Sequence, residues 1–334
     1  MTRLLLAGTG LIGHRHMQHI LDHPKLTLAG IIDPVAENRQ AEVVPGYAQI
    51  KDVPNDIAVD GIILATPTGT HAPLTSEALE RGWHVLVEKP VADTLEAADA
   101  MIASSADAGR HVLVGHHRRH HPCVQMLREI MHSGRLGRPV AASLLWLMKK
   151  PNDYFDVDWR AGMDGAPVKQ NLIHDVDTLR WVFGDVVEVC GIGSNDIRGA
   201  ARTESGGAVL RFTSGVIVTI TFADTTPTPW GFEAGTGESP AIPRTHQDSL
   251  RVACTHGAIE FPSLQLWSGA ESWNERPEMM QTDVTEAVPL IVQLEHFSDV
   301  IAGRATPVIT AQDARETLAT ILEIERVTRP QGAM

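Results

Sequence analysis

Three groups of residues in this 334-residue sequence combine side chains and spacing that could carry chemistry. The first is a glycine-rich run, Gly8-Thr9-Gly10-Leu11-Ile12-Gly13, followed twenty residues later by Asp33. The second is Lys89, within Glu88-Lys89-Pro90, and the third is His174 with Asp177 three residues on. We expect the first group to bind a dinucleotide and the other two to bind and deprotonate a substrate.

The glycine run stands in the context that dinucleotide binding requires. An apolar run at Arg3–Ala7 predicts a buried strand before it, and a helix-like stretch follows it. Gly8 allows the tight turn, Gly10 the approach of a pyrophosphate, and Gly13 close packing of helix on strand. The N–H groups that begin the helix attract the phosphates. Asp33 would accept hydrogen bonds from ribose hydroxyls and repel a 2′-phosphate, which favours NAD and leaves NADP as an alternative. Glycines that serve packing alone are the other interpretation.

Lys89 and His174 suit the oxidation of an alcohol. Lys89 ends a predicted buried strand, where an unpaired cation costs several kcal/mol. A cation there could bind a substrate hydroxyl, or it could be a surface lysine paired with Glu88. His174 and Asp177 share one face of a predicted helix. A histidine titrates near neutral pH and can remove the hydroxyl proton while a hydride leaves, with Asp177 holding the ring or a neighbouring hydroxyl. A hydrogen-bonded core histidine is the alternative.

The elements that must position these residues change character along the chain. The first third alternates helices with apolar strands, which predicts a doubly wound parallel sheet of the Rossmann type. The predicted strands are Arg3–Ala7, Leu26–Ile32, Gly61–Ala65, His84–Val87 and His111–Val114. Ligands of such sheets collect at the carboxyl ends of the strands. The segments expected there are the glycine run, Thr66-Pro67-Thr68, Glu88-Lys89-Pro90 and Gly115-His116-His117-Arg118-Arg119.

After His121 the alternation stops, and runs of strands follow one another before two closing helices. Residues 224–247 are rich in Pro and Gly and are expected to form a long loop. This pattern predicts an α+β domain built on a large, mainly antiparallel open sheet. We therefore expect an NAD(P)-binding Rossmann domain over 1–121. A substrate-binding and oligomerisation domain is expected over 122–334.

Four motifs in this order resemble the glucose–fructose oxidoreductase, inositol dehydrogenase and rhizopine-catabolism (Gfo/Idh/MocA) family. They are the glycine run, Glu88-Lys89-Pro90, Gly115-His116-His117-Arg118-Arg119, and Asn171-Leu172-Ile173-His174-Asp175-Val176-Asp177. The closing segment from Glu295 to Arg304 also resembles the family's terminal helices. The resemblance implies that Lys89 contacts substrate and cofactor, that His174 is the acid/base, and that the second sheet mediates homodimers or homotetramers.

The resemblance also implies further contacts. It adds Thr66, Pro67, His71 and Glu88 to the cofactor-binding set. Candidates for substrate contact are His117, Arg118, Trp159, Arg160, Asn171 and His174. Many family members carry an Asp four residues before this histidine, but Gln170 stands there, followed by Asn171. Lys169 could meet an anionic substrate group.

The sequence is therefore interpreted as an NAD(P)-dependent oxidoreductase. Its expected substrate is a cyclic polyol (a sugar, an inositol or a related carbocyclic diol) or a hydroxy acid. One alternative is a silent dinucleotide sensor that binds without reacting, and another is an enzyme that recycles a non-dissociating cofactor. Tyr47-Ala48-Gln49-Ile50-Lys51 matches the Tyr-x-x-x-Lys of short-chain dehydrogenases, but it lies too early in the chain for that family's catalytic helix.

Composition excludes other classes. The 28 Lys and Arg against 41 Asp and Glu give a net charge of −13, which argues against nucleic-acid binding. Only three cysteines, Cys123, Cys190 and Cys254, occur, so we expect no disulfide framework and a cytoplasmic protein. The apolar start leads into the glycine run and is not taken as a signal peptide, and no apolar run approaches about 18 residues.

Two groups of histidines complete the chemistry-bearing residues. His116–His121 carries two arginines at its centre and matches no ligand spacing, so no metal is expected. The histidines at 14, 16, 19 and 23 on the first helix are interpreted as a polar face near the cofactor.

Overall fold

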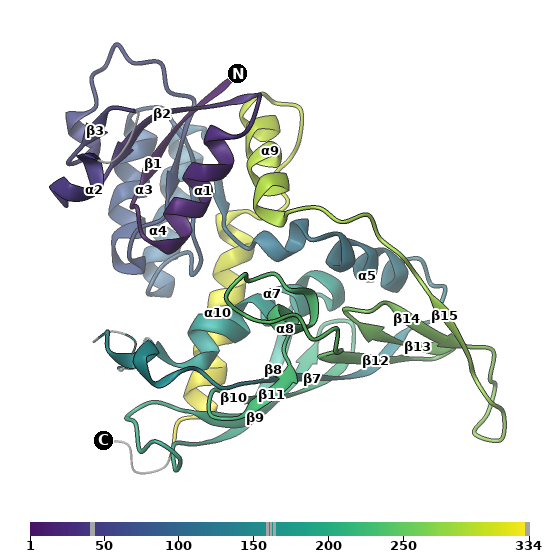
Figure 1. Cartoon of the computed structure of the whole chain (residues 1–334). Helices are drawn as coiled ribbons and strands as arrows, with labels where there is room; N and C mark the ends of the chain where they lie inside the picture. The colour runs from purple at the N-terminus through teal and green to yellow at the C-terminus, as the bar shows by residue number, and fades with distance from the viewer. Residues whose placement is uncertain (41–43, 158–159, 161, 163–164, 331–334) are drawn as a thin grey trace. The chain divides into compact units, whose positions relative to one another are not determined.

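The computed structural model describes residues 1–40, 44–157, 160, 162 and 165–330. Contacts divide the chain into two compact units. Unit 1 comprises Met1–His120 and Ala287–Leu318, and unit 2 comprises His121–Glu286 and Ala319–Met334 (Figure 1). The chain passes from unit 1 to unit 2 at His121, next to the domain boundary expected after residue 121. Ala287–Leu318, however, belong to unit 1 again. That return has a physical cause, because Leu294, Phe297 and Val300 of α9 (Pro289–Ile301) are buried in the core of unit 1.

Unit 1 is built on the expected parallel sheet. Its described strands run in the order β3-β2-β1-β4-β5-β6, and every neighbouring pair is parallel. The strands are β1 (Thr2–Ala7), β2 (Leu26–Ile32), β3 (Gly46–Tyr47), β4 (Gly61–Leu64), β5 (His84–Val87) and β6 (Val112–Val114). Strand order reverses between β1 and β4, the place where doubly wound sheets bind their ligands. The Rossmann prediction is confirmed; the two-residue strand β3 was not predicted.

Helices cover this sheet and close its core. They are α1 (Leu11–Leu21), α2 (Ala36–Gln40), α3 (His71–Glu80), α4 (Leu95–Ala108) and α9. Thr94 caps α4 by accepting from the Ala97 N–H, and Gly109 ends it in the left-handed conformation that glycine favours. The buried face of α1 consists of Gly13, His16, Met17 and Ile20. A histidine therefore lies among the apolar side chains that pack on the sheet.

Unit 2 is built on a larger mixed sheet. Its described strands run β15-β14-β13-β12-β7-β10-β9-β8, with β11 paired to β7 off this path. Their bounds are β7 (Pro139–Met148), β8 (Val186–Ser194), β9 (Ser205–Phe212), β10 (Ile217–Ala223), β11 (Pro227–Trp230), β12 (Leu250–Cys254), β13 (Gly257–Phe261), β14 (Gln265–Ser268) and β15 (Glu278–Gln281). All pairs are antiparallel except β10 with β7, so the expected mainly antiparallel sheet is confirmed.

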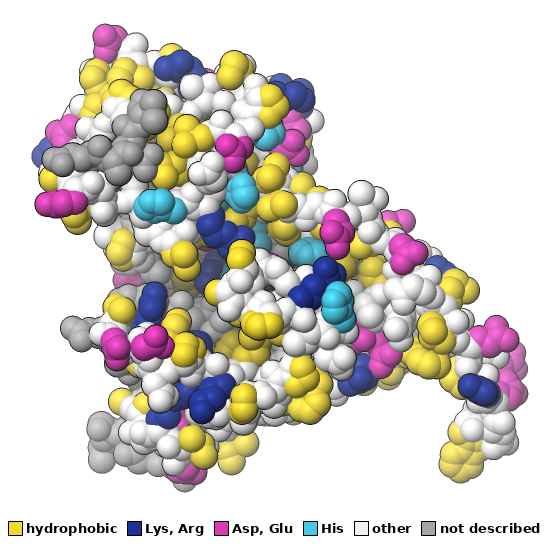
Figure 2. Space-filling view, viewed as in Figure 1, with side chains coloured by type: hydrophobic (Ala, Val, Ile, Leu, Met, Phe, Trp, Pro, Cys, Tyr) yellow, Lys and Arg dark blue, Asp and Glu magenta, His cyan; other side chains and the backbone are white. Residues whose placement is uncertain are grey.

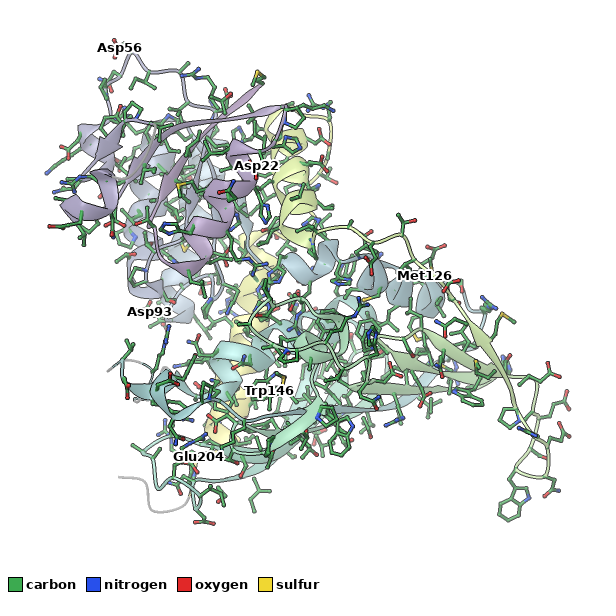
Figure 3. The ribbon with its side chains drawn as sticks, viewed as in Figure 1. Asp22, Asp56, Asp93, Met126, Trp146 and Glu204 are labelled. Atoms are coloured by element: carbon green, nitrogen blue, oxygen red, sulfur yellow. The ribbon has the colours of Figure 1, made fainter. Side chains whose placement is uncertain are left out.

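Helices pack against one face of this sheet. They are α5 (Pro122–His132), α7 (Ile173–Phe183), α8 (Phe232–Thr236) and the end of α10 (Ala311–Val327). Trp146 of β7 lies in this core with 2% of its surface exposed (Figure 3). On the other face no described helix packs, and Val209 and Ile217 remain 43% and 37% exposed. The sheet is thus open on that side.

Residues 224–247 differ from the expected continuous loop. They contain the short strand β11 and the helix α8. The helix forms because Phe232 and Ala234 are buried against the sheet, a tertiary effect that a Pro- and Gly-rich stretch does not reveal. None of the described helices is both long and apolar enough to cross a lipid bilayer.

Candidate active site

The glycine run forms a tight turn between β1 and α1. Gly8 has φ +86°, and a Cβ there would lie 2.5 Å from the Ala65 carbonyl oxygen on β4's loop. A Cβ on Gly13 would lie 2.1 Å from the Gly8 carbonyl oxygen. By contrast, no atom of the described residues lies within 4 Å of a Cβ built on Gly10. Gly8 and Gly13 are therefore needed for the turn itself, whereas Gly10 keeps space open in front of it.

The start of α1 has the features of an anion-binding terminus. The helix begins at Leu11, which is 85% exposed, and its N-cap, Gly10, has no side chain to satisfy the first N–H groups. The first turn contains no acidic residue. Free N–H groups and the helix dipole favour a phosphate at such an end. The loop therefore fits the pyrophosphate of a dinucleotide.

Asp33 follows β2 at the same edge of the sheet and is 5% exposed. Its Oδ2 accepts hydrogen bonds from the N–H and hydroxyl of Thr9, and its Oδ1 accepts one from the Val35 N–H. Burial raises the pKa of Asp33, but hydrogen bonds from Thr9, Val35 and Asn38 more than offset burial, so the pKa lies below its ordinary value. A carboxylate oxygen accepts more than one hydrogen bond, so this charged group also fits a ribose hydroxyl.

His71 ties two loops of this edge together. Its ring is 1% exposed, with Nδ1 2.9 Å from the Pro90 carbonyl oxygen and Nε2 2.9 Å from the Thr66 carbonyl oxygen. Burial lowers the pKa of His71, although both carbonyls act in the opposite direction. His71 therefore holds the Thr66-Pro67 turn and the Glu88-Lys89-Pro90 segment in place.

Glu88 is held by a residue that sequence reasoning did not assign to the site. His16 of α1 is fully buried, and its Nε2 lies 2.7 Å from Glu88 Oε1. The expectation of a polar helix face is thus wrong for His16, because that position points to the sheet. Burial raises the pKa of Glu88, but the hydrogen bond from His16 and the charges of His16, His117 and Lys89 outweigh burial and lower it. The signal was available, since positions 13, 16, 17 and 20 share one helical face.

Lys89 stands beside this buried pair. It is half-buried, and its main-chain N–H lies 3.3 Å from Glu88 Oε2. Gly115, at the end of β6, admits the carboxylate, because a Cβ there would lie 2.9 Å from Glu88 Cδ. The ends of β5 and β6 and helix α1 therefore fix the residue that precedes Lys89.

The run after β6 is buried throughout. The residues from His117 to His120 form a 3₁₀ turn, with exposures of 9% for His117 and 1% for Arg118. Arg119 pairs with Asp313 of α10. The ring of His120 lies tilted against that of His296, with ring centroids 5.1 Å apart, and burial lowers the pKa of His120 to about 3.

The candidate acid/base, His174, belongs to unit 2. His174 and Asp177 lie on α7, with exposures of 8% and 0%. A π-helical turn, Val168–Leu172, leads directly into α7 and contains Asn171. Such turns are rare and are frequent at functional sites. Of the pair, His174 keeps a little exposed surface, whereas Asp177 is fully buried.

Other substrate candidates in unit 2 have mixed outcomes. Arg160 packs its guanidinium 4.6 Å from the centre of the Tyr154 ring. Lys169, expected to meet an anionic substrate group, pairs with Glu325 at 3.3 Å. Trp159 lies outside the described residues. The described residues contain no group of three His, Cys, Asp or Glu side chains arranged to hold a metal ion.

The loop, the helix terminus and the parallel sheet define a dinucleotide-binding oxidoreductase fold, and family models agree. Residues 2–116 match the oxidoreductase family with an NAD-binding Rossmann fold, and residues 124–260 match the GFO/IDH/MocA C-terminal domain. The chain is 30% identical over 289 residues to 1,5-anhydro-D-fructose reductase of Ensifer adhaerens, covering 82% of this chain and 79% of that protein. It belongs to the Gfo/Idh/MocA family, as its motifs predicted.

Two further comparisons extend this result. Inositol 2-dehydrogenase 4 of Saccharopolyspora erythraea is 31% identical over 233 residues. That match covers 65% of each protein, slightly under two thirds. A crystal structure of an oxidoreductase from Agrobacterium radiobacter, in complex with NAD+, L-tartaric acid and magnesium, superposes with a TM-score of 0.81 at 16% identity. It covers 98% of this chain and 96% of that one, and it shows the shared fold. The chain is thus an NAD-binding oxidoreductase of the dehydrogenase type.

Proposed function

We propose that this protein transfers a hydride between NAD and a hydroxyl-bearing or keto carbon of a cyclic polyol, with Lys89 and His174 at the reacting centre. The observation that carries the proposal is the placing of His174. His174 keeps 8% of its surface exposed just after a π-helical turn, and Asp177, three residues further along α7, is fully buried. An ordinary core histidine needs neither that turn nor a residual exposed edge.

The chemistry needs few groups. NAD, when bound, accepts the hydride from the carbon that carries the hydroxyl. The Lys89 ammonium binds the hydroxyl oxygen, and His174 takes the hydroxyl proton, so that an alcohol becomes a ketone. Asp177 orients the imidazole, and Asn171 bonds a neighbouring hydroxyl. Reduction runs the same steps backwards, with His174 returning the proton.

The relatives guide the choice of substrate. Two curated relatives are named for inositol and for 1,5-anhydro-D-fructose, both polyhydroxylated rings. We infer a sugar, an inositol or a related carbocyclic diol here, with His117, Arg118 and Arg160 as further contacts. A hydroxy acid is the second candidate, favoured by the tartaric acid named for one structure of the same fold.

The proposed preference for NAD over NADP depends on the residues that follow β2. The negative charge of Asp33 supports NAD over NADP, because a 2′-phosphate would be repelled. Arg39 lies next to it and donates to the Asp33 and Pro34 carbonyl oxygens. That cation could serve a 2′-phosphate if the carboxylate were removed.

Further parts of the proposal concern organisation. We infer that the chain up to residue 121 binds NAD and the rest binds substrate. We also infer that the open face of the second sheet joins copies into dimers or tetramers, supported by the exposed Val209 and Ile217. A cytoplasmic location is supported by the three free cysteines.

The test is a screen of sugars, inositols and hydroxy acids with NAD and NADP, read at the NADH absorbance. Lys89→Met and His174→Gln should each abolish turnover while leaving the NAD dissociation constant within about threefold. The controls are Lys51→Met and His246→Gln, both at exposed positions, which should keep turnover. Lys51 also belongs to the Tyr-x-x-x-Lys run, so loss of turnover in its variant would favour that rival. Binding of NAD without reduction by any compound would support a sensor, and normal turnover of both test variants would remove the catalytic assignment.

A further inference from the structure

We propose that the segment between β14 and β15, residues 268–278, is an arm that binds a second copy of this chain. Its tip residue, Trp273, would enter a pocket of the other copy between His132 and His256. This inference extends the proposed self-association from the open face of the second sheet to its edge. It concerns neither the NAD site nor the catalytic residues.

The arm presents a large aromatic side chain to solvent. Trp273 is 96% exposed, the most exposed of the large hydrophobic side chains described. The tip is an ordered turn: the Glu271 N–H donates to Glu275 Oε2 at 2.9 Å, and the Glu275 N–H donates to the Ser272 carbonyl at 3.1 Å. Figure 2 shows the arm projecting from the sheet with hydrophobic surface at its end and acidic side chains along it. Trp is enriched in the centres of protein interfaces, where its burial contributes most.

The strand at the base of the arm is also without a cover. β15 ends the order of the sheet, and no described strand pairs with its outer side. All four of its residues are exposed, with Met279 at 52% and Met280 at 49%. An unpaired edge with apolar side chains is a ready template for another strand.

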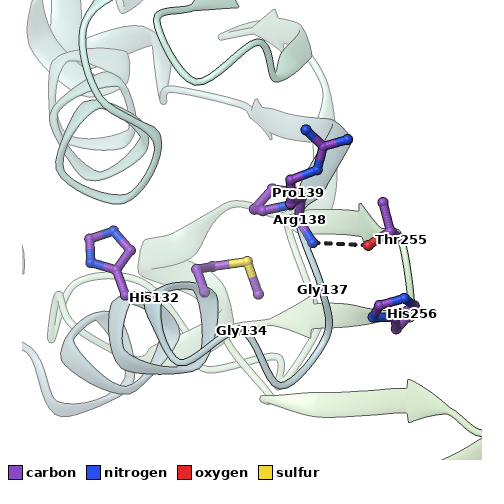
Figure 4. A pocket seen from close by; sticks show the side chains of 8 residues that line it. His132, Gly134, Gly137, Arg138, Pro139, Thr255 and His256 are labelled. Atoms are coloured by element: carbon purple, nitrogen blue, oxygen red, sulfur yellow. Dashed lines mark hydrogen bonds between the residues drawn. The ribbon is translucent and has the colours of Figure 1, made fainter.

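A pocket of suitable size lies at the same base. It has a volume of about 560 Å³ and is lined by Met131, His132, Gly134, Gly137, Arg138, Pro139, Thr255 and His256. Figure 4 shows His132 and His256 on opposite sides, with the Arg138 N–H donating to the Thr255 hydroxyl at 3.0 Å. This volume is within the range of about 300–1,000 Å³ typical of ligand pockets and exceeds the space an indole needs. The buried Met131 supplies an apolar floor.

The charges of arm and pocket are complementary. The arm carries Glu271, Glu275 and Glu278 against one cation, Arg276. The eight residues that line the pocket include one arginine and two histidines and neither Asp nor Glu. In a chain of net charge −13, a pocket without carboxylates suits an acidic partner.

Geometry favours a second copy over another protein. Arg135, between two pocket residues, donates to Met280 Sδ at 2.7 Å, so the pocket lies where the arm begins. Five residues of extended chain from Ser268 to the tip reach about 17 Å. Two arms lying antiparallel therefore put each Trp273 at the base of the other arm. This is an isologous contact, in which each copy offers the same arm and the same pocket.

The first test is the molar mass of the full chain in solution, measured by light scattering. Wild type is expected at a multiple of 36.3 kDa, and Trp273→Glu and Arg138→Glu are each expected to halve that mass. The control is Ile197→Glu, at a 73%-exposed residue between β8 and β9, outside the strands of the sheet, which should leave the mass unchanged. A monomeric wild type, or Trp273→Glu with the wild-type mass, overturns the proposal. Ile217→Asp tests the open face of the sheet separately. Loss of the arm–pocket contact is therefore distinguished from loss of a contact through the open face.

A second measurement locates the contact directly. A photo-crosslinking benzoylphenylalanine at position 273 is irradiated in a mixture of ¹⁴N- and ¹⁵N-labelled chains. Mixed-isotope peptides joining residue 273 to residues 131–139 or 254–257 are the expected result. Crosslinks that are only intramolecular, or that reach other segments or a different protein, overturn the proposal. Because position 273 is at the exposed tip, neither Trp273→Glu nor benzoylphenylalanine at this position threatens folding.

Discussion

Replacing His16 with alanine should destabilise the protein far more than any other histidine change on α1. The imidazole is fully buried and lies 2.7 Å from Glu88 Oε1, whose side chain is 9% exposed. Removing one partner of such a buried pair leaves the other without its counterpart and costs about 3–5 kcal/mol. We expect a loss of that size in the free energy of unfolding of His16→Ala at pH 7.

The loss should also depend on pH, because it is carried by the charge of Glu88. In the wild type the pKa of Glu88 is lowered, so its stabilising contribution is present above its unfolded pKa of about 4.3 and is lost as pH falls through the folded pKa. Without His16, burial is opposed only by the charges of His117 and Lys89, so we expect the pKa of Glu88 to rise. The variant's deficit should then be largest near pH 8 and shrink toward pH 5, where a protonated Glu88 is tolerated.

The assay is urea unfolding at pH 8, 7 and 5, with His19→Ala as the matched control. His19 lies on the same helix, is only half-buried, and should cost less than about 1 kcal/mol. Adding Glu88→Gln to His16→Ala should recover part of the loss, because the uncompensated charge is removed. The reasoning is refuted if His16→Ala costs no more than His19→Ala, or if its deficit is the same at all three pH values.

Three further predictions concern unit 1. Gly10→Ala should leave the melting temperature unchanged, because its Cβ has open space, but should weaken NAD binding about tenfold or more by calorimetry. Gly13→Ala, with a Cβ 2.1 Å from the Gly8 carbonyl oxygen, should cost about 1–3 kcal/mol of stability. Equal behaviour of the two variants would contradict this. Asp33→Ser should raise the ratio of NADP to NAD turnover, and an unchanged ratio would remove the assigned role. His120 lies tilted against His296, and burial lowers its pKa to about 3. Acidification from pH 6.5 to 3 should therefore cost up to about 5 kcal/mol of stability. His120→Gln should flatten that dependence, and an unchanged acid profile would contradict it.

The parallel sheet could be predicted because its buried strands are continuous apolar runs. The bounds of β2 and β5 coincide with the predicted Leu26–Ile32 and His84–Val87. Other elements carry no such signal. β3 has two residues, and the four of β15, Glu-Met-Met-Gln, form a strand only because β14 pairs with them. Tertiary pairing decides such segments, so their own composition does not reveal them.

The candidate site was predictable where one motif carries its own chemistry. The glycine run and Asp33 needed only local context, and the structure places them at one edge of the sheet. The partner of Glu88 was missed because the histidines at 14, 16, 19 and 23 were treated as one polar face, although His16 is the buried one among the three on α1. The pairing of Lys169 with Glu325 joins residues 156 positions apart, which no local pattern reveals.

The most direct test of the central claim is a crystal structure of the protein with NAD and a bound substrate or product. The account predicts Lys89 Nζ and a ring nitrogen of His174 both within about 2.6–3.2 Å of the same substrate oxygen, beside the nicotinamide ring. Lys89 and His174 facing separate cavities, or a substrate oxygen held by neither, would contradict it.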